Sequence, residues 1–371
     1  MKRIFTSWKV VLGIVLLVLS VGTGVYLLLS SNRGAKIIDG PIKIGVMTPL
    51  SGDSGSYGYP MLKGVELAKK ETGRTDIEII VEDTKCETDA ALKAFPKLIE
   101  KGVIAIIGEA CSGPTLALIP EIEKEHILLV SPSSTSPDLT GASKYFFRTS
   151  PSDVLQSAFG ANLLIKRGYK TLGIMYTDEI YGQLLAKALE NEFRDLKGKV
   201  VFSMPHDPGE RDFSDQITQM MEKNPSALYI VSNAPSSGAA IIRQLGVKGY
   251  KGQIIGSDGM WANSVIRESG KNSEGLIIAT TTGGNSRFVQ LHKLEYGVEP
   301  GPASAQAYDA FKSIWLAIEK GATDKEDLAD KMATVKFEGA SGPIDFDANG
   351  DIEGTYDVFI VKNQKFVKLE N

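Results

Sequence analysis

Short apolar segments alternate with segments of helical spacing from Pro41 onward, and this alternation restricts the possible folds more than any other feature. Residues 42–47 form an apolar run typical of a strand, whereas residues 59–72 repeat their apolar side chains at the spacing of a helix. Strands that alternate with helices in this way are typical of βαβ units built around a parallel sheet. The sequence therefore predicts an α/β fold.

The alternation occurs in two successive sets. Strands are expected at residues 42–47, 77–81, 103–107 and 127–130, and then at 171–175, 199–203, 227–231 and 253–255. Helices are expected between them, and the chain becomes β-rich again beyond residue 342. A chain of 371 residues is long enough for two domains with sizeable cores. We therefore expect two α/β units of similar size, without a detectable sequence repeat between them.

The first 33 residues differ from the rest of the chain. Basic residues near the start precede an uncharged run at residues 10–29, which is long enough to span a bilayer. This charge distribution places the N-terminus in the cytoplasm and the remaining chain outside. The length of the run favours an uncleaved signal anchor, with residues 34–40 as a tether. A signal peptide cleaved near residues 22–24, which would release the protein, is the alternative.

Charge and composition exclude several classes of function. The net charge is −4, and acidic and basic residues are interspersed, so the basic stripe of a nucleic-acid-binding protein is missing from the sequence. Three histidines and two cysteines are too few and too scattered to predict a metal site. Residues 52–55, Gly-Asp-Ser-Gly, look like a serine-hydrolase signature, but no histidine has a supporting context. A hydrolase is therefore the weakest hypothesis, and we expect no cofactor.

Polar loops follow the predicted strands. In open parallel sheets, ligands bind outside the carboxyl ends of the strands. The loops expected there are rich in Ser, Thr, Gly, Tyr and Asp: residues 51–58, 84–87, 109–113, 131–137, 177–182, 205–211, 232–237 and 257–261. Two such units facing each other would enclose a polar cleft for a small ligand.

The stretch 106–115 contains a candidate anion site. It reads as the end of a buried strand, a tight loop and a helix start, with Ser112 as the N-cap and Gly113 and Pro114 in the first turn. A helix start offers unpaired N–H groups and a favourable dipole to a carboxylate or phosphate. The alternative is that Ser112 bonds only to its own helix.

Several motifs make the chain resemble a known family. They occur in the family's order at residues 44–58, Glu82-Asp83 with Cys86, 107–112, 131–139, 176–182, 256–259 and 342–350. With these motifs the chain resembles the leucine/isoleucine/valine-binding branch of type I periplasmic binding proteins, the solute receptors of ABC amino-acid importers. The resemblance implies two doubly wound parallel-sheet lobes joined by a three-segment hinge. Lobe 1 would comprise residues 41–149 and 281–339, and lobe 2 residues 150–280 and 340–371.

The resemblance also implies roles for individual residues. Ser112 matches the serine that binds the α-carboxylate of an amino acid through its hydroxyl and backbone N–H. Ser133 would accept a hydrogen bond from the ammonium through its carbonyl, and Thr135 would contact both ends of the ligand. Asp258 matches the acidic residue that meets the ammonium from lobe 2. The alternatives are a turn that satisfies its own backbone at 133–135 and a helix N-cap at Asp258.

Further positions concern the walls of the cleft. Tyr57 and Tyr181 match aromatic residues on its two lips, although tyrosines in loops are often packing residues. Trp261 is either a pocket residue or a core residue. The resemblance pairs Cys86 with Cys111 in a disulfide, which export would permit, and two free cysteines are the alternative. At residues 232–234 the family often places an aromatic residue that this chain lacks, which predicts a roomier or more polar pocket.

The sequence thus leads to a functional hypothesis. We expect a monomeric extracytoplasmic receptor that captures a branched-chain or related amino acid and delivers it to an ABC permease and ATPase, without catalysis. The same cleft acting as a sensor for a signalling partner is the alternative, but the chain contains no cytoplasmic output domain of its own.

Overall fold

The computed structural model describes residues 41–369. The membrane-spanning segment predicted within residues 1–33 and the tether at 34–40 lie outside the described residues. Within residues 41–369, no helix has both the length and the apolar character that crossing a membrane requires.

A five-stranded sheet forms the first lobe, and all of its strand pairs are parallel. Its order is β2-β1-β3-β4-β5. The strands are β1 (Ile42–Thr48), β2 (Ile77–Asp83), β3 (Ala105–Ile107), β4 (Leu128–Ser131) and β5 (Phe146–Arg148). The helices that share its apolar core are α2 (Gly55–Glu71), α3 (Thr88–Glu100), α4 (Ser112–Glu125), α10 (Ser286–Tyr296), α11 (Ser304–Glu319) and α12 (Lys325–Met332).

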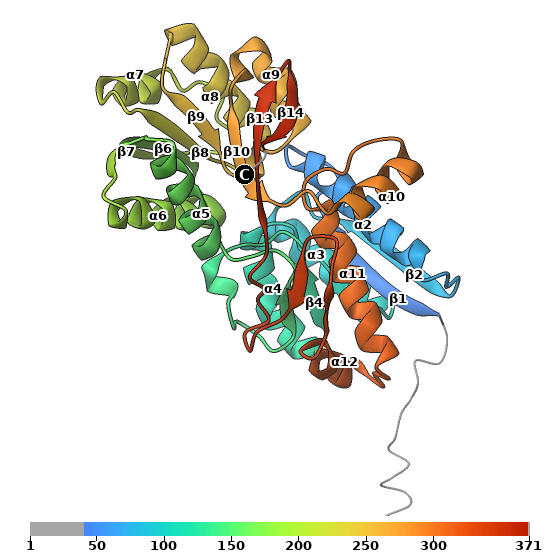
Figure 1. Cartoon of the computed structure of the whole chain (residues 1–371). Coiled ribbons are helices and arrows are strands. Elements are labelled where there is room, and N and C mark those ends of the chain that lie inside the picture. The colour runs from blue at the N-terminus through green and yellow to red at the C-terminus, as the bar shows by residue number, and fades with distance from the viewer. Residues whose placement is uncertain (1–40, 370–371) are drawn as a thin grey trace, which may run out of the picture.

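A seven-stranded sheet forms the second lobe, in the order β14-β13-β10-β9-β8-β6-β7. Its strands are β6 (Thr171–Thr177), β7 (Lys199–His206), β8 (Ala227–Val231), β9 (Gln253–Gly256), β10 (Ile277–Thr281), β13 (Tyr356–Lys362) and β14 (Lys365–Leu369). The helices are α5 (Asp153–Lys166), α6 (Ile180–Asp195), α7 (Ser214–Glu222), α8 (Pro235–Lys248) and α9 (Asn263–Ser269). Figure 1 shows this lobe above the first, with β13 and β14 at its edge. These two strands pair antiparallel and are an addition to the parallel sheet.

Short elements complete the chain. They are the 3₁₀ helices η1 (Pro137–Leu139), η2 (Asp258–Met260) and η3 (Gly270–Ser273), and the two-stranded antiparallel sheet of β11 (Lys336–Glu338) and β12 (Pro343–Asp345). The predicted α/β fold with parallel sheets is confirmed.

Both sheets show the same strand order when the strands of each lobe are counted from its own first strand. In the first lobe β1 lies between β2 and β3, and in the second β6 lies between β7 and β8. The direction of winding reverses at β1/β3 and at β6/β8, and a crevice forms outside the carboxyl ends of such strands. The topology therefore places the β1, β3, β6 and β8 loops where a ligand site is expected.

Strand β8 illustrates why strands of the second sheet appear in the sequence as continuous apolar runs. Leu228 and Ile230 pack in the apolar cluster that includes α7, α8 and α9. Tyr229 and Val231 point to the opposite face and join the cluster that includes α5 and α6. Because both faces of a parallel sheet are covered by helices, its strands need apolar side chains on both sides.

The chain passes between the lobes three times, after β5, after β10 and before β13. Ile344, Phe346 and Ile352 belong to the apolar cluster of the first lobe, whereas β13 belongs to the second sheet. We therefore propose that the third crossing lies at residues 353–355, after the limit at residue 340 that the resemblance implies. The other lobe limits remain predictions.

Candidate functional site

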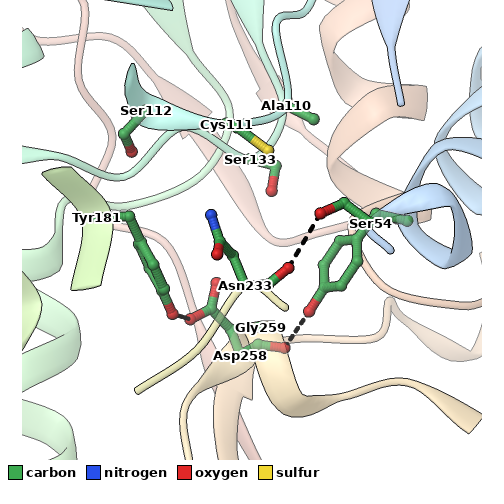
Figure 2. A pocket seen from close by; sticks show the side chains of 10 residues that line it. Ser54, Ala110, Cys111, Ser112, Ser133, Tyr181, Asn233, Asp258 and Gly259 are labelled. Carbon is green, nitrogen blue, oxygen red and sulfur yellow. Dashed lines mark hydrogen bonds between the residues drawn. The ribbon is translucent and has the colours of Figure 1, made fainter. Parts of the chain in front are cut away.

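A small cavity lies between the lobes at the predicted position. The space between protein atoms is about 380 Å³, counting the part that is open to solvent. The cavity is lined by Ser54, Tyr57, Ala110, Cys111, Ser112, Ser133, Tyr181, Asn233, Asp258 and Gly259 (Figure 2). These residues come from the loops and helix starts that follow β1, β3 and β4 in the first lobe and β6, β8 and β9 in the second.

The structure brings five of the six predicted ligand residues to this cavity and leaves one behind its wall. Ser112, Ser133, Tyr57, Tyr181 and Asp258 all line it. The sixth, at position 135, is buried nearby but does not line the cavity. The geometry is therefore compatible with the predicted roles, which remain predictions.

Ser112 lies at the start of α4, one position further into the helix than the sequence predicts. The N-cap is Cys111, and Ser112 is the first helical residue. Its hydroxyl oxygen accepts a hydrogen bond from the backbone N–H of Ser136 at 3.2 Å and makes no capping bond to its own helix. The prediction of Ser112 as the N-cap is therefore wrong by one residue. The start of the helix still borders the cavity, where its dipole favours a negative group.

Asp258 forms the opposite, negatively charged end of the cavity. Its carboxylate accepts hydrogen bonds from the Tyr181 hydroxyl at 2.5 Å and from the Gln156 side-chain amide at 2.6 Å. The hydroxyl of Tyr57, from the other lobe, donates to its backbone carbonyl (Figure 2). Burial raises the pKa of the Asp258 carboxyl, and the two side-chain donors offset part of that rise. The residue begins η2, and the N-cap of α9 is Ala262, so Asp258 does not cap that helix.

Hydrogen-bond acceptors with few partners gather next to Asp258. The amide oxygen of Gln156 has no partner, and the carboxylate of Asp153 has at most the hydroxyl of Thr135. Asp153 is fully buried, and its pKa is raised by burial and by the nearby charge of Asp258. None of these residues lines the cavity, so Asp258 is the carboxylate that faces a ligand from the second lobe.

A buried carboxyl and a disulfide support the loop before Ser112. Cys111 is bonded to Cys86 with their Cα atoms 5.5 Å apart, as the resemblance implies. Glu109 is fully buried, and its carboxylate accepts hydrogen bonds from the Thr84 hydroxyl and the Cys111 backbone N–H. Burial raises the pKa of Glu109 to about 7, although these hydrogen bonds oppose the rise. The loop therefore has few ways to move independently of β2 and β3.

Direct contacts join the two lobes beside the cavity. The hydroxyl of Ser54 donates to the backbone carbonyl of Asn233 at 3.1 Å (Figure 2). The carboxylate of Asp53 accepts from the hydroxyl of Ser236 and lies 3.7 Å from the guanidinium of Arg211. These contacts join the loop after β1 to the second lobe, so closure of the hinge would make and break them.

A buried ion pair fixes the loop after β4. Arg148 is fully buried and forms two hydrogen bonds of 2.6 Å with the carboxylate of Asp351. The same guanidinium donates to the backbone carbonyl of Ser136 at 2.8 Å and to the Thr140 hydroxyl at 2.7 Å. It therefore connects the loop that carries Ser133 to the segment that precedes the third crossing.

The prediction missed several residues around the cavity. Ser54, Ala110, Asn233 and Gly259 lie in loops that the sequence predicts at the carboxyl ends of strands. That position was a signal from which a place in the cavity could have been predicted for them. Gln156 had no such signal, because it reads as an ordinary helical residue.

Trp261, which the sequence left open as either a pocket or a core residue, is buried in the second lobe, where it stacks on Phe359 with ring centroids 4.7 Å apart. Within the described part of the chain, no group of His, Cys, Asp or Glu side chains suits a metal ion.

Comparison with known proteins defines the class. A family model described as periplasmic binding protein matches residues 41–365. The chain belongs to the periplasmic binding protein family. It is therefore an extracytoplasmic solute-binding receptor and not an enzyme.

Individual relatives are of the type I, Leu/Ile/Val-binding kind. A Leu/Ile/Val-binding protein from Citrobacter freundii is 26% identical over 326 residues, which cover 84% of this chain and 88% of the relative. The structure is similar to that of a leucine-binding protein from Thermotoga maritima, with a TM-score of 0.84 and 32% identity over 89% of this chain and 98% of the other. It is also similar to a branched-chain amino acid transporter substrate-binding protein from Streptococcus pneumoniae in complex with isoleucine. That match has a TM-score of 0.78 and 27% identity, and it covers 88% of this chain and 99% of the other.

Proposed function

We propose that this receptor captures a free α-amino acid between its lobes and delivers it to an ABC permease and its ATPase. The observation that carries the proposal is the opposed chemistry of the two ends of the cavity. One end is the start of α4 with Ser112, and the other is the buried carboxylate of Asp258. A zwitterion with its carboxylate at the first end and its ammonium at the second complements both.

The two ends of the cavity belong to different lobes, and this explains how ligand binding would favour closure. Ser112 and Ser133 belong to the first lobe, whereas Asp258 and Tyr181 belong to the second. A ligand that contacts both lobes binds the closed arrangement more tightly than the open one, and this difference in affinity shifts the equilibrium toward closure. The names of the relatives support an amino acid as the ligand and an ABC transporter as the partner.

Calorimetric titration of the soluble part with the common amino acids tests the proposal. We expect at least one of them to bind, and Ser112→Ala and Asp258→Asn each to weaken its binding by about 10- to 150-fold, since a hydrogen bond to a charged group contributes about 1.5–3 kcal/mol. Ser214→Ala is the matched control for the first variant, because Ser214 also begins a helix but is exposed. Exposed Asp178 provides the control Asp178→Asn. Failure of every amino acid to bind would refute the proposal.

Delivery and tethering need separate measurements. We propose that residues 10–29 anchor the receptor in the membrane as a monomer, with cleavage of a signal peptide as the alternative. Loss of uptake of the radiolabelled ligand in cells that lack the receptor would support import. Unchanged uptake together with a lost transcriptional response would instead support the sensor.

A further inference from the structure

One wall of the cavity carries an amide whose position is well defined. Asn233 follows β8 and precedes α8, at the point where the winding of the second sheet reverses. Its backbone carbonyl accepts the hydrogen bond from Ser54 of the first lobe at 3.1 Å. Figure 2 shows its side-chain amide directed into the cavity, between Tyr181 and Ser133. The backbone is therefore held across the cleft, while the amide faces the space that a ligand would occupy.

The amide has little to bind within the protein. Its nitrogen lies 3.9 Å from the sulfur of Cys86, which is a weak acceptor, and within residues 41–369 it has no other hydrogen-bond partner. Two hydroxyls of the cavity are already used, because Ser54 donates to the Asn233 carbonyl and Tyr57 donates to the Asp258 carbonyl. The amide of Asn233 thus offers two donors and one acceptor at this end of the cavity.

The residues that line the cavity with the amide are uncharged apart from Asp258. Ala110, Gly259 and the serines are small, and Tyr57 and Tyr181 are the aromatic side chains among them. A charged ligand side chain would therefore find no countercharge there, beyond the carboxylate that meets the ammonium. A large apolar side chain would cover the amide and leave it without a hydrogen bond, which is costly once water is excluded.

We propose that Asn233 selects an α-amino acid with a short, uncharged, hydrogen-bonding side chain, that is, a hydroxyl or carboxamide. This inference rests on the proposed function and specifies the ligand class of the same site. The amide would donate to the hydroxyl or carbonyl oxygen of the ligand, or accept from its O–H or N–H. A site built to pair such a group discriminates strongly against the isostere that lacks it, because the protein's own polar group is then left unpaired.

Two pairs of amino acids of matched shape test the inference by calorimetric titration. Threonine and valine differ by a hydroxyl in place of a methyl group, and asparagine and leucine have the same branching. We expect the wild type to bind the polar member of at least one pair about tenfold or more tightly, since an unpaired buried group costs about 1–3 kcal/mol. In Asn233→Leu the preference should disappear or reverse, whereas Asn162→Leu, on the exposed face of α5, should keep it.

The outcomes separate the inference from the proposed function. If the wild type binds valine and leucine as tightly as threonine and asparagine, the role of Asn233 is refuted and the receptor function stands. If no amino acid binds, both fail. Asn233→Ala serves as a second variant without a branched side chain at the contact between the lobes. It should bind alanine as the wild type does and lose the preference within each pair, and a preference retained in Asn233→Ala would overturn the inference.

Discussion

Replacement of Glu109 by glutamine should change how the stability of this receptor depends on pH. The Glu109 carboxyl is fully buried beside the candidate carboxylate site, and its pKa rises from 4.5 to about 7. Glutamine has the same shape and keeps both hydrogen bonds. Its carbonyl oxygen can accept from the Cys111 N–H, and its amide can donate to the Thr84 hydroxyl oxygen.

The sign and size of the effect follow from proton linkage. Between pH 4.5 and about 7, Glu109 is protonated in the folded protein but ionised in the unfolded chain. Its contribution to stability is fully present below pH 4.5 and is lost as the pH rises to about 7. Each pH unit corresponds to about 1.4 kcal/mol, so the total loss is about 3.5 kcal/mol. Glu109→Gln removes this loss because glutamine does not titrate.

Urea unfolding of both proteins from about pH 4.5 to about pH 8 measures the difference. We expect Glu109→Gln and the wild type to be similar at the acidic end. The variant should become more stable than the wild type by about 3.5 kcal/mol near pH 8. Glu100→Gln is the control, since the side chain of Glu100 is exposed and is in water in both states. Parallel curves for the wild type and Glu109→Gln would refute the reasoning, because a group that is buried and neutral cannot be removed without changing the slope.

Three further perturbations have defined outcomes. Replacement of Cys86 and Cys111 by serine should lower the free energy of unfolding by about 3.5 kcal/mol, from the 25-residue separation that the disulfide closes, and reduced wild type should match the variant in urea unfolding. Arg148→Met should cost about 3 kcal/mol by leaving the half-buried Asp351 carboxylate without its cation, and a loss below about 1 kcal/mol would contradict this. Gly58→Ala should strongly destabilise the first lobe because its Cβ would lie 1.7 Å from a backbone carbonyl oxygen, and an unchanged melting temperature would exclude that clash.

Local patterns in the sequence predicted the helices and strands closely where periodicity and end signals agree. The strand at 227–231 has the predicted limits, and the strands predicted at 42–47 and 253–255 are each one residue longer in the structure. Helix α2 begins at Gly55, earlier than the predicted residue 59, because its glycine-rich first turn has the composition of a loop. Strand β5 was not predicted, since three residues are too few to show a period and only their pairing with β4 defines them.

The candidate site could likewise be predicted only in part from the sequence. The loop positions of Ser112, Ser133 and Asp258 could be predicted because the carboxyl ends of parallel strands share one edge of a sheet. The hydrogen bonds from Gln156 and Tyr181 to Asp258 could not, because they depend on how a helix packs beside that edge.

By itself, the sequence determined the α/β class, the two sets of strands and helices, and the polar loops that could carry a ligand site. These properties depend on side-chain periodicity, capping and turn residues, which act over a few positions. Only the tertiary structure decided which loops face each other, that Asn233 directs a free amide into the cavity, and that Arg148 reaches Asp351. Contacts such as these join residues far apart in the chain, so their partners are selected by packing across the two lobes and leave no local pattern in the sequence.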